Sequence, residues 1–155
     1  MMKKLLLTQA LFLLSTVTYA VPNVWDTGFE KGHDVYLIND TKNNKLVMSC
    51  ASGTGDTGDH SVYITTSQRT DYETAYKNTI SKRPLTFLIN QQVVAVPPAT
   101  TKTSNSSSEW KKFRNKIAGA KQIEAYWNDK KVVTFNPRNP NATLDLKDCL
   151  SKFEE

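Results

Sequence analysis

The sequence predicts a mainly β protein, an antiparallel β-sandwich or curled sheet with two short peripheral helices. Three observations predict it. Short apolar runs rich in β-branched and aromatic residues alternate with polar turns, two later segments carry apolar residues at helical spacing, and neither a parallel βαβ rhythm nor an internal repeat is present. The chain has 155 residues, the length of a single domain.

The predicted strands are the β-favouring runs, each bounded by turn residues. The last two are joined by Asn128-Asp129 and form the clearest hairpin of the sequence. In chain order the runs are Val35–Ile38, Lys45–Cys50, Ser61–Thr66, Leu85–Ile89, Val93–Val96, Gln122–Trp127 and Lys130–Phe135.

Two helices are predicted in the second half of the chain. The first is capped by Ser107 or Ser108, buries the stripe of Trp110, Phe113 and Ile117, and ends at Gly119. The second has its apolar face at Leu146, Cys149, Leu150 and Phe153. Residues 69–82 remain ambiguous, with a helical stripe at Tyr72, Ala75, Tyr76 and Ile80.

The first twenty residues have the pattern of an export signal. Lys3 and Lys4 precede the apolar run Leu5–Leu14, and the small-residue site Thr18–Ala20 follows. We expect a signal peptide over 1–20 and a single β-rich domain over 21–155, with no membrane-spanning segment after cleavage, because the apolar run is shorter than the roughly 20 residues of a spanning helix. The predicted location is the bacterial periplasm or the exterior.

Charge and composition argue against several functions. The net charge is +5, but two of the lysines lie in the predicted signal and the others are interspersed with polar and acidic residues, so nucleic-acid binding is not expected. Two cysteines and two histidines, not at finger spacing, do not make a structural zinc site. In an oxidising compartment we expect Cys50 and Cys149 to form a disulfide, since no Cys-x-x-Cys motif indicates a reactive thiol.

The candidate catalytic and ligand-binding stretches are weak. The Gly53–Asp59 loop offers Asp56 and Asp59 to an ion but lacks the phosphate-loop and calcium-loop patterns, so a plain loop is favoured over an ion site. Asp59-His60-Ser61 are neighbours in sequence, and a catalytic triad is assembled from separate positions. We expect His60 and His33 to be loop histidines at the surface.

No catalytic residue, cofactor or metal ligand is therefore predicted. Carboxylates for a glycosidase pair exist, but only their separation in space would support one; they are Glu30, Glu73, Glu109, Glu124 and Asp145.

The tryptophans suggest a surface for binding sugars or peptides. Trp25, Trp110 and Trp127 are its candidates, although the helical position of Trp110 favours the core. Tyr126 and Trp127 are adjacent on a strand, so one points inward and the other outward. Both are candidate partner contacts, and Tyr126 is the outward one if Ile123, Ala125 and Trp127 face the core.

The order of features resembles a known family. After the export signal come Trp25, a Leu-x-x-Ser-Cys strand end (Leu46–Cys50), Ile89-Asn90, a Trp-x-x-Phe helix (Trp110, Phe113), an Ala-Lys-x-Ile-Glu-x-Tyr strand (Ala120–Tyr126), Thr134–Asn136 and Cys149. This order resembles small exported β-sandwich proteins of the invasion-associated locus B type and similar secretion-accessory proteins. The resemblance implies a sandwich fold and a role in the envelope, and it carries no catalytic motif.

The expected function is non-catalytic binding of another macromolecule, as in a secretion or conjugation accessory, a virulence-associated factor or an inhibitor. The expected partner is another envelope or secreted protein, bound at an exposed strand edge or at the aromatic side of the 122–135 hairpin. The alternatives are a small-ligand carrier, which requires an apolar cavity of roughly 300 Å³ or more, and a carboxylate-based envelope hydrolase.

Overall fold

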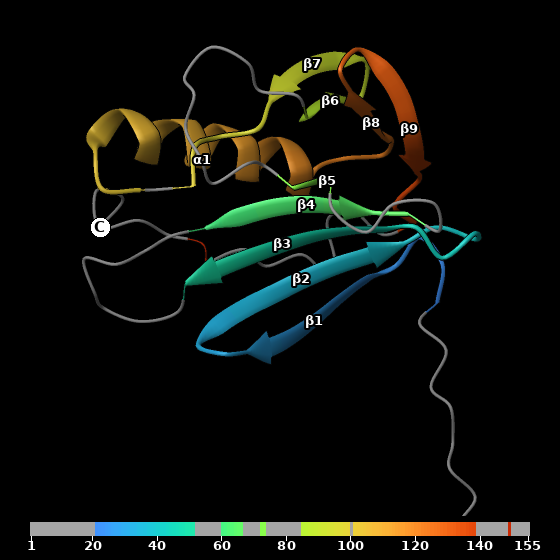
Figure 1. Ribbon diagram of the computed structural model, residues 1–155, viewed down its shortest axis with the longest axis horizontal. Helices are drawn as coiled ribbons and strands as arrows, with labels where there is room; N and C mark the ends of the chain where they lie inside the picture. The colour runs from blue at the N-terminus through green and yellow to red at the C-terminus, as the bar shows by residue number, and fades with distance from the viewer. Residues whose placement is uncertain are drawn as a thin grey trace, which may run out of the picture.

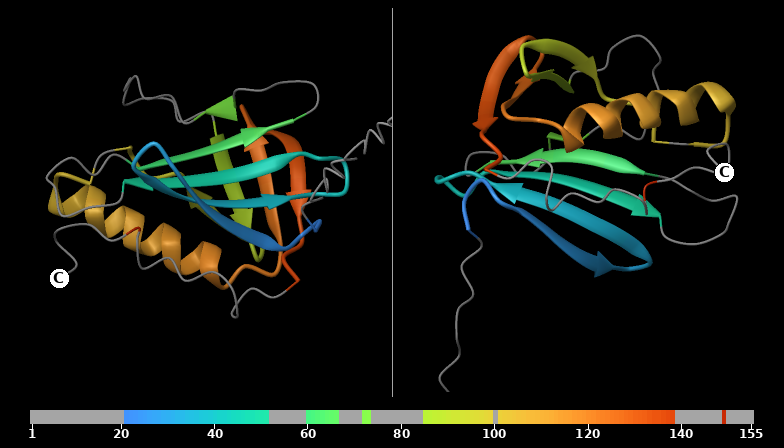
Figure 2. Two further views of the ribbon diagram at one scale, coloured as in Figure 1. Left: turned by 90° about the horizontal axis from the view of Figure 1, so that it is seen from below. Right: turned by 180° about the vertical axis from the view of Figure 1, so that it is seen from behind.

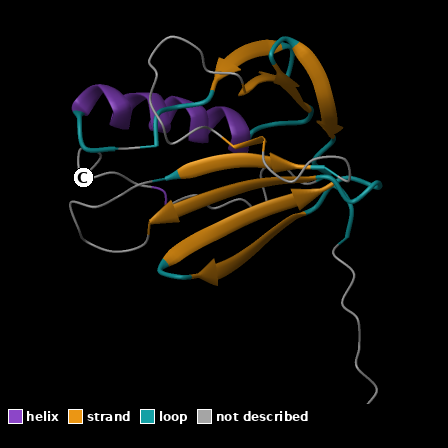
Figure 3. Cartoon of the chain, viewed as in Figure 1, coloured by secondary structure: helices purple, strands orange, loops and turns teal. Residues whose placement is uncertain are grey.

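The computed structural model describes residues 21–51, 60–66, 72–73, 85–99, 101–138 and 149. Within them the chain forms nine strands in two antiparallel sheets and one α-helix, which makes it a mainly β protein as predicted (Figures 1 and 3). The second predicted helix lies outside the described residues except for Cys149.

The first sheet has five strands, and its order in space is the order along the chain. Every neighbouring pair is antiparallel, and the register aligns Trp25, Ile38, Leu46 and Ile64 in one buried row across the sheet. The strands are β1 (Trp25–Glu30), β2 (His33–Asn39), β3 (Lys45–Ala51), β4 (Ser61–Thr65) and β5 (Tyr72–Glu73). Tyr72 therefore lies in a strand and not in a helix.

The second sheet has four strands in the order β7-β6-β8-β9. Its central pair, β6 with β8, joins segments on either side of the helix, and two hairpins extend it to its edges. The strands are β6 (Leu85–Ile89), β7 (Gln92–Ala95), β8 (Ile123–Trp127) and β9 (Lys130–Phe135).

Three hairpins close through two-residue turns, which set the register of their strands. Both turn residues have positive φ in each case: Lys31 and Gly32 at 51° and 83°, Asn90 and Gln91 at 48° and 67°, and Asn128 and Asp129 at 47° and 63°. This backbone is the type I′ turn, whose twist matches that of antiparallel strands.

Helix α1 (Ser104–Ala118) lies between β7 and β8 in the chain. It begins earlier than the sequence predicts. Thr103 is the N-cap: its side chain accepts a hydrogen bond from Ser106 N, and its backbone N–H donates to Ser106 Oγ. This reciprocal capping box satisfies free N–H groups of the first turn. The predicted cap at Ser107 or Ser108 is wrong, and Ser107 is a buried residue of the first turn.

The second sheet and α1 together lie on one face of the first sheet, and the strands of the two sheets run across each other (Figure 2). Trp110, Phe113 and Ile117 point from α1 into the core, as predicted, with at most 1% of their surface exposed. Phe87 of β6 packs against Phe113 with ring centroids 5.9 Å apart, which joins the helix to the second sheet. Apolar burial of this kind is the main stabilising contribution to the fold.

Candidate binding surface

The outer face of the second sheet is the first candidate surface. The pairing register places Val93, Leu88, Glu124 and Thr134 in one row that points away from the core. Val93 is 80% exposed, whereas the inward neighbours Phe87 and Ile89 are buried, as the period-two alternation of strands requires. The row beside it contains Tyr126 and Lys131, paired across β8 and β9.

A small hydrogen-bonded cluster lies on this face. The Tyr126 hydroxyl donates to Glu124 Oε2 at 2.7 Å, and the Lys131 amine lies 3.3 Å from Glu124 Oε1. The hydrogen bond from Tyr126 and then that from Lys131 hold the pKa of Glu124 below its ordinary value. The same contact raises the pKa of Tyr126, because ionisation would remove the proton that is donated. Glu124 is thus held as a carboxylate acceptor.

Tyr126 and Trp127 point to opposite sides of the sheet, as expected of neighbours on a strand. Trp127 is half-buried and packs against the core beside Ala125 and Ile123, so Tyr126 is the residue that faces outward. Their role in partner contact stays a prediction.

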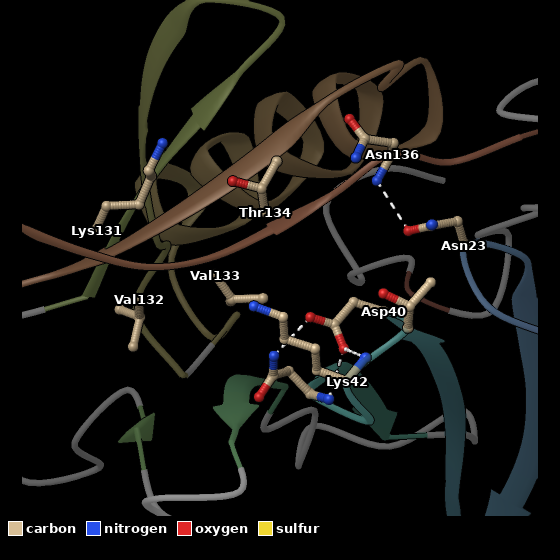
Figure 4. A pocket seen from close by; sticks show the side chains of 10 residues that line it. Asn23, Asp40, Lys42, Lys131, Val132, Val133, Thr134 and Asn136 are labelled. Atoms are coloured by element: carbon tan, nitrogen blue, oxygen red, sulfur yellow. Dashed lines mark hydrogen bonds between the residues drawn. The ribbon is translucent and has the colours of Figure 1, made fainter.

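A pocket of about 380 Å³ lies between the second sheet and one end of the first (Figure 4). One wall is the β2–β3 turn, the other is β9, and most of the lining is polar. The residues are Asp40, Thr41, Lys42 and Asn44 of the turn, Lys131, Val132, Val133 and Thr134 of β9, and Asn23 and Asn136. Sequence reasoning missed this pocket because its walls lie about 90 positions apart and neither carries a binding motif.

Asp40 holds the turn wall of the pocket in shape. Its Oδ1 accepts hydrogen bonds from the backbone N–H groups of Lys42 and Asn44, both at 2.8 Å, and its Oδ2 accepts from Asn44 Nδ2 at 2.5 Å. Asn43, at φ 63°, makes the left-handed step of this turn. The carboxylate of Asp40 is therefore committed to the turn, and Lys42 extends from a rigid support.

The β9 wall contains an irregularity. Ala125 pairs with Val133 and Tyr126 with Lys131, so Val132 is an extra residue in the ladder. Such a bulge bends an edge strand and redirects its side chains, and bulges are common beside binding sites. Val132 packs partly against the core and also lines the pocket.

Cys50 and Cys149 form a disulfide, the pairing that the sequence predicts. Their Cα atoms are 5.1 Å apart and the bridge spans 99 positions. Both residues are buried, and Arg114 of α1 donates a hydrogen bond to the Cys149 carbonyl oxygen at 3.2 Å. The bridge thus joins β3 to a late segment that also contacts the helix.

The expectation that His60 lies at the surface is wrong. Only 1% of its surface is exposed, and its ring packs edge-on to Trp110 with centroids 4.9 Å apart. Its Nδ1 accepts a hydrogen bond from the Ala51 N–H at 3.2 Å, and the backbone N–H of His60 donates to the Ala99 carbonyl oxygen at 2.7 Å. Its role is to pack the core beneath the helix.

Two of the candidate tryptophans are core residues, so they do not form a binding face. Trp25 is 5% exposed and Trp110 is 1% exposed, and the Trp110 Nε1 donates to the Pro98 carbonyl oxygen at 2.6 Å. Burial of these rings, one on β1 and one on α1, stabilises the packing of the two layers.

The other candidate residues are dispersed or lie outside the described residues. His33 is partly exposed at the start of β2, with Nδ1 3.2 Å from the Lys31 carbonyl oxygen. Glu30, Glu109 and Glu124 lie on three different elements, β1, α1 and β8. Asp56 and Asp59 of the loop, Asp145, and the side chain of Glu73 lie outside the part described.

Neither a metal cluster nor a spanning helix occurs in the described ranges. No group of three or more His, Cys, Asp and Glu side chains in them is placed to hold a metal ion. No helix there has both the length and the hydrophobicity needed to cross a membrane.

Together these features define a mainly β protein of two crossed antiparallel sheets and one helix, with a disulfide between early and late segments. The profile of the YfjT family matches residues 23–144, and the chain belongs to that family. It is 27% identical over 157 residues to the uncharacterized protein YfjT of Escherichia coli strain K12, which covers 96% of this chain and 95% of the relative.

A second relative is similar over a shorter part of the chain. The uncharacterized protein YkfB of the same strain is 24% identical over 135 residues, which is 84% of each chain. No solved structure matches the chain. Neither relative is described as a protein of the invasion-associated locus B type, so the resemblance to that type stays a prediction.

Proposed function

We propose that this chain is an exported bacterial envelope protein that binds another macromolecule and catalyses no reaction on it. The observation that carries the proposal is the outer face of the second sheet. There, the exposed apolar Val93 lies in the same row as Glu124, beside the row of Tyr126 and Lys131. Apolar contact area combined with aromatic and charged groups is typical of protein interfaces.

Three further observations support export and a role without catalysis. A buried disulfide is typical of proteins in oxidising compartments. The pKa of Glu124 is lowered, so this carboxylate does not fit the general-acid role of a hydrolase, which needs a raised pKa. The pocket of about 380 Å³ has a mostly polar lining, unlike the apolar cavity that a carrier of hydrophobic ligands requires.

The test is capture of the partner in the source bacterium. The full chain, with its own N-terminal segment and a C-terminal tag, is crosslinked in intact cells, purified and analysed by mass spectrometry. We expect one envelope protein to be enriched, to be lost with Val93→Glu and to be reduced with Tyr126→Ala. Lys112→Glu, on the exposed side of α1, is the matched control and should retain the partner.

Two results would count against the proposal. One is equal recovery of the same proteins by the wild type, by Val93→Glu and by a folded unrelated envelope protein. The other concerns export: two reactive thiols in the unreduced, unfolded protein taken from the cell would show that Cys50 and Cys149 are not oxidised there. Thermal unfolding of each variant verifies that loss of capture is not loss of the fold.

A further inference from the structure

The pocket beside β9 follows the edge of a strand. Four consecutive residues of β9, Lys131 to Thr134, line it. Val133 points toward the core and Thr134 away from it, and the bulge at Val132 separates Val133 from the outward Lys131, so a space that touches all four lies along the strand edge and not against one face. β9 is the last strand of its sheet, and its pairing within the described residues is with β8 alone.

Such an edge offers backbone N–H and C=O groups to a further strand. The opposite wall is the β2–β3 turn, held rigid by Asp40, so the space is a groove between a strand edge and a fixed turn. Neighbouring strands lie about 4.8 Å apart, so an extended chain paired with β9 would lie at that distance from its backbone, on the side of the turn.

An earlier part of the same chain already forms hydrogen bonds next to this edge. Just beyond β9, the Asn136 N–H donates to Asn23 Oδ1 at 3.0 Å, and the Arg138 N–H donates to the Asn23 carbonyl oxygen at 2.9 Å. Asn23 thus occupies the continuation of the edge and closes one end of the groove (Figure 4). The part along residues 131–134 is the part left open as a pocket.

The charge of the groove indicates which chain it takes. Lys42 and Lys131 line it, and the exposed Lys130 lies next to them at the start of β9. The Lys131 amine is paired with Glu124 at 3.3 Å, so Lys42 and Lys130 supply the positive charge that this pair does not balance. The carboxylate among the lining residues is Asp40, and its oxygens accept three hydrogen bonds within its own turn. The groove is therefore positive, and acidic side chains complement it.

We propose that this groove binds an extended, acidic segment of a protein partner, which adds to β9 as a further strand. The inference rests on the proposed function, because it specifies the chemistry of the partner. Backbone hydrogen bonds supply the strand pairing, and glutamate or aspartate side chains facing Lys42 supply the selectivity.

The test uses four fluorescein-labelled seven-residue peptides and the full chain, measured by fluorescence anisotropy. The first peptide is Thr-Glu-Val-Glu-Val-Glu-Thr with blocked ends. The second has lysine in place of each glutamate. The third and fourth are the acidic peptide with N-methyl groups on one or on the other set of alternate residues. Each form has one methylated backbone edge, and that edge cannot pair with β9.

We expect the acidic peptide to bind in a salt-sensitive manner and roughly tenfold more tightly than the basic one, as charge complementarity at an exposed site predicts. One of the two methylated forms should not bind. Lys42→Glu should weaken binding by roughly tenfold, because a repulsion replaces an attraction. The turn uses the backbone N–H of Lys42 and so survives the change. Lys112→Glu, the same charge change on α1, should bind as the wild type does.

Four outcomes would overturn the inference. Equal binding of both methylated forms would show attraction without strand addition. Equal affinities of Lys42→Glu and Lys112→Glu would place the peptide elsewhere. A third outcome is that the chain self-associates in the ultracentrifuge, that Lys42→Glu abolishes this self-association, and that no peptide binds. The occupant of the groove would then be a second copy of the chain. If partner capture in cells survives Lys42→Glu but not Val93→Glu, the groove inference fails while the proposed function stands.

Discussion

The side chain of Asn23 accepts a hydrogen bond from the backbone N–H of Asn136, 3.0 Å away and 113 positions later in the chain. The Asn23 N–H in turn donates to the Asn39 carbonyl oxygen, at 2.7 Å, at the end of β2. One residue outside both sheets therefore joins the end of the first sheet to the chain that leaves the second. Its φ of 60° is a conformation that asparagine tolerates better than most residues.

Asn23→Ala should lower the free energy of unfolding by about 2 kcal/mol, from the lost side-chain hydrogen bond and from the strain of alanine at positive φ. Asn23→Gly removes the same hydrogen bond without the strain and should lower it by about half as much. Urea unfolding measures both. Equal stability of the two variants and the wild type would mean that this contact does not couple the sheets.

Asn90 should be more sensitive than its neighbour Gln91. Its Oδ1 accepts from the N–H groups of Lys121 and Gln122, at 2.8 and 3.1 Å, and its Nδ2 donates to the Gly119 carbonyl oxygen at 3.2 Å. We expect Asn90→Gly to cost about 1–3 kcal/mol, since these contacts hold the link from α1 to β8. Gln91→Gly should be neutral or stabilising, because glycine relieves a φ of 67°. A reversed order in thermal unfolding would contradict this.

Loss of the disulfide should be the largest single effect. A bridge that spans 99 positions restricts the unfolded chain strongly, and the chain-entropy model puts the stabilisation of a 100-residue loop at about 4.7 kcal/mol. We expect the double variant Cys50→Ala with Cys149→Ala to unfold at a much lower urea concentration. A reductant should lower the stability of the wild type and leave that variant unchanged. A reductant effect of equal size on both would contradict the prediction.

Acid should destabilise the protein partly through Glu124. Its pKa is lower in the folded chain than in the unfolded chain, first because of Tyr126 and then because of Lys131. The stabilisation that ionised Glu124 contributes is therefore complete above the pKa of the unfolded chain, and it is lost as the pH falls through the pKa of the folded chain. Glu124→Gln should reduce the loss of stability on acidification, and Tyr126→Phe should reduce it in part. An unchanged pH profile of unfolding would show that the cluster is not coupled to folding.

Sequence reasoning identified the strands in which apolar and β-branched residues predominate, such as β3 and β6, because their burial dominates the pattern. It missed β1, where five of the six residues are exposed and one is glycine. That strand exists because β2 offers it an edge and Trp25 anchors it in the core. The early start of α1 was missed because the capping partner at its third position is Ser106, where glutamate is usual.

The site was less accessible to prediction than the fold. Tyr126 faces outward because alternation along β8 requires it, so this was predictable. His60 was placed at the surface because glycine and aspartate precede it, yet Trp110, fifty positions away, buries it. The β9 groove depends on the approach of the β2–β3 turn, which local patterns do not contain.

The division of the strands between the sheets has a consequence for the time course of folding. All strands of the first sheet come from residues 25–73 and all those of the second from residues 85–135, so each sheet can form from its own stretch of chain. Two-residue hairpins form within about 1–10 μs. Cys149 follows every strand of the described residues, so during synthesis its oxidation with Cys50 can only secure strands that are already made. Pulse-labelling of thiols during synthesis would therefore report the last stage of maturation.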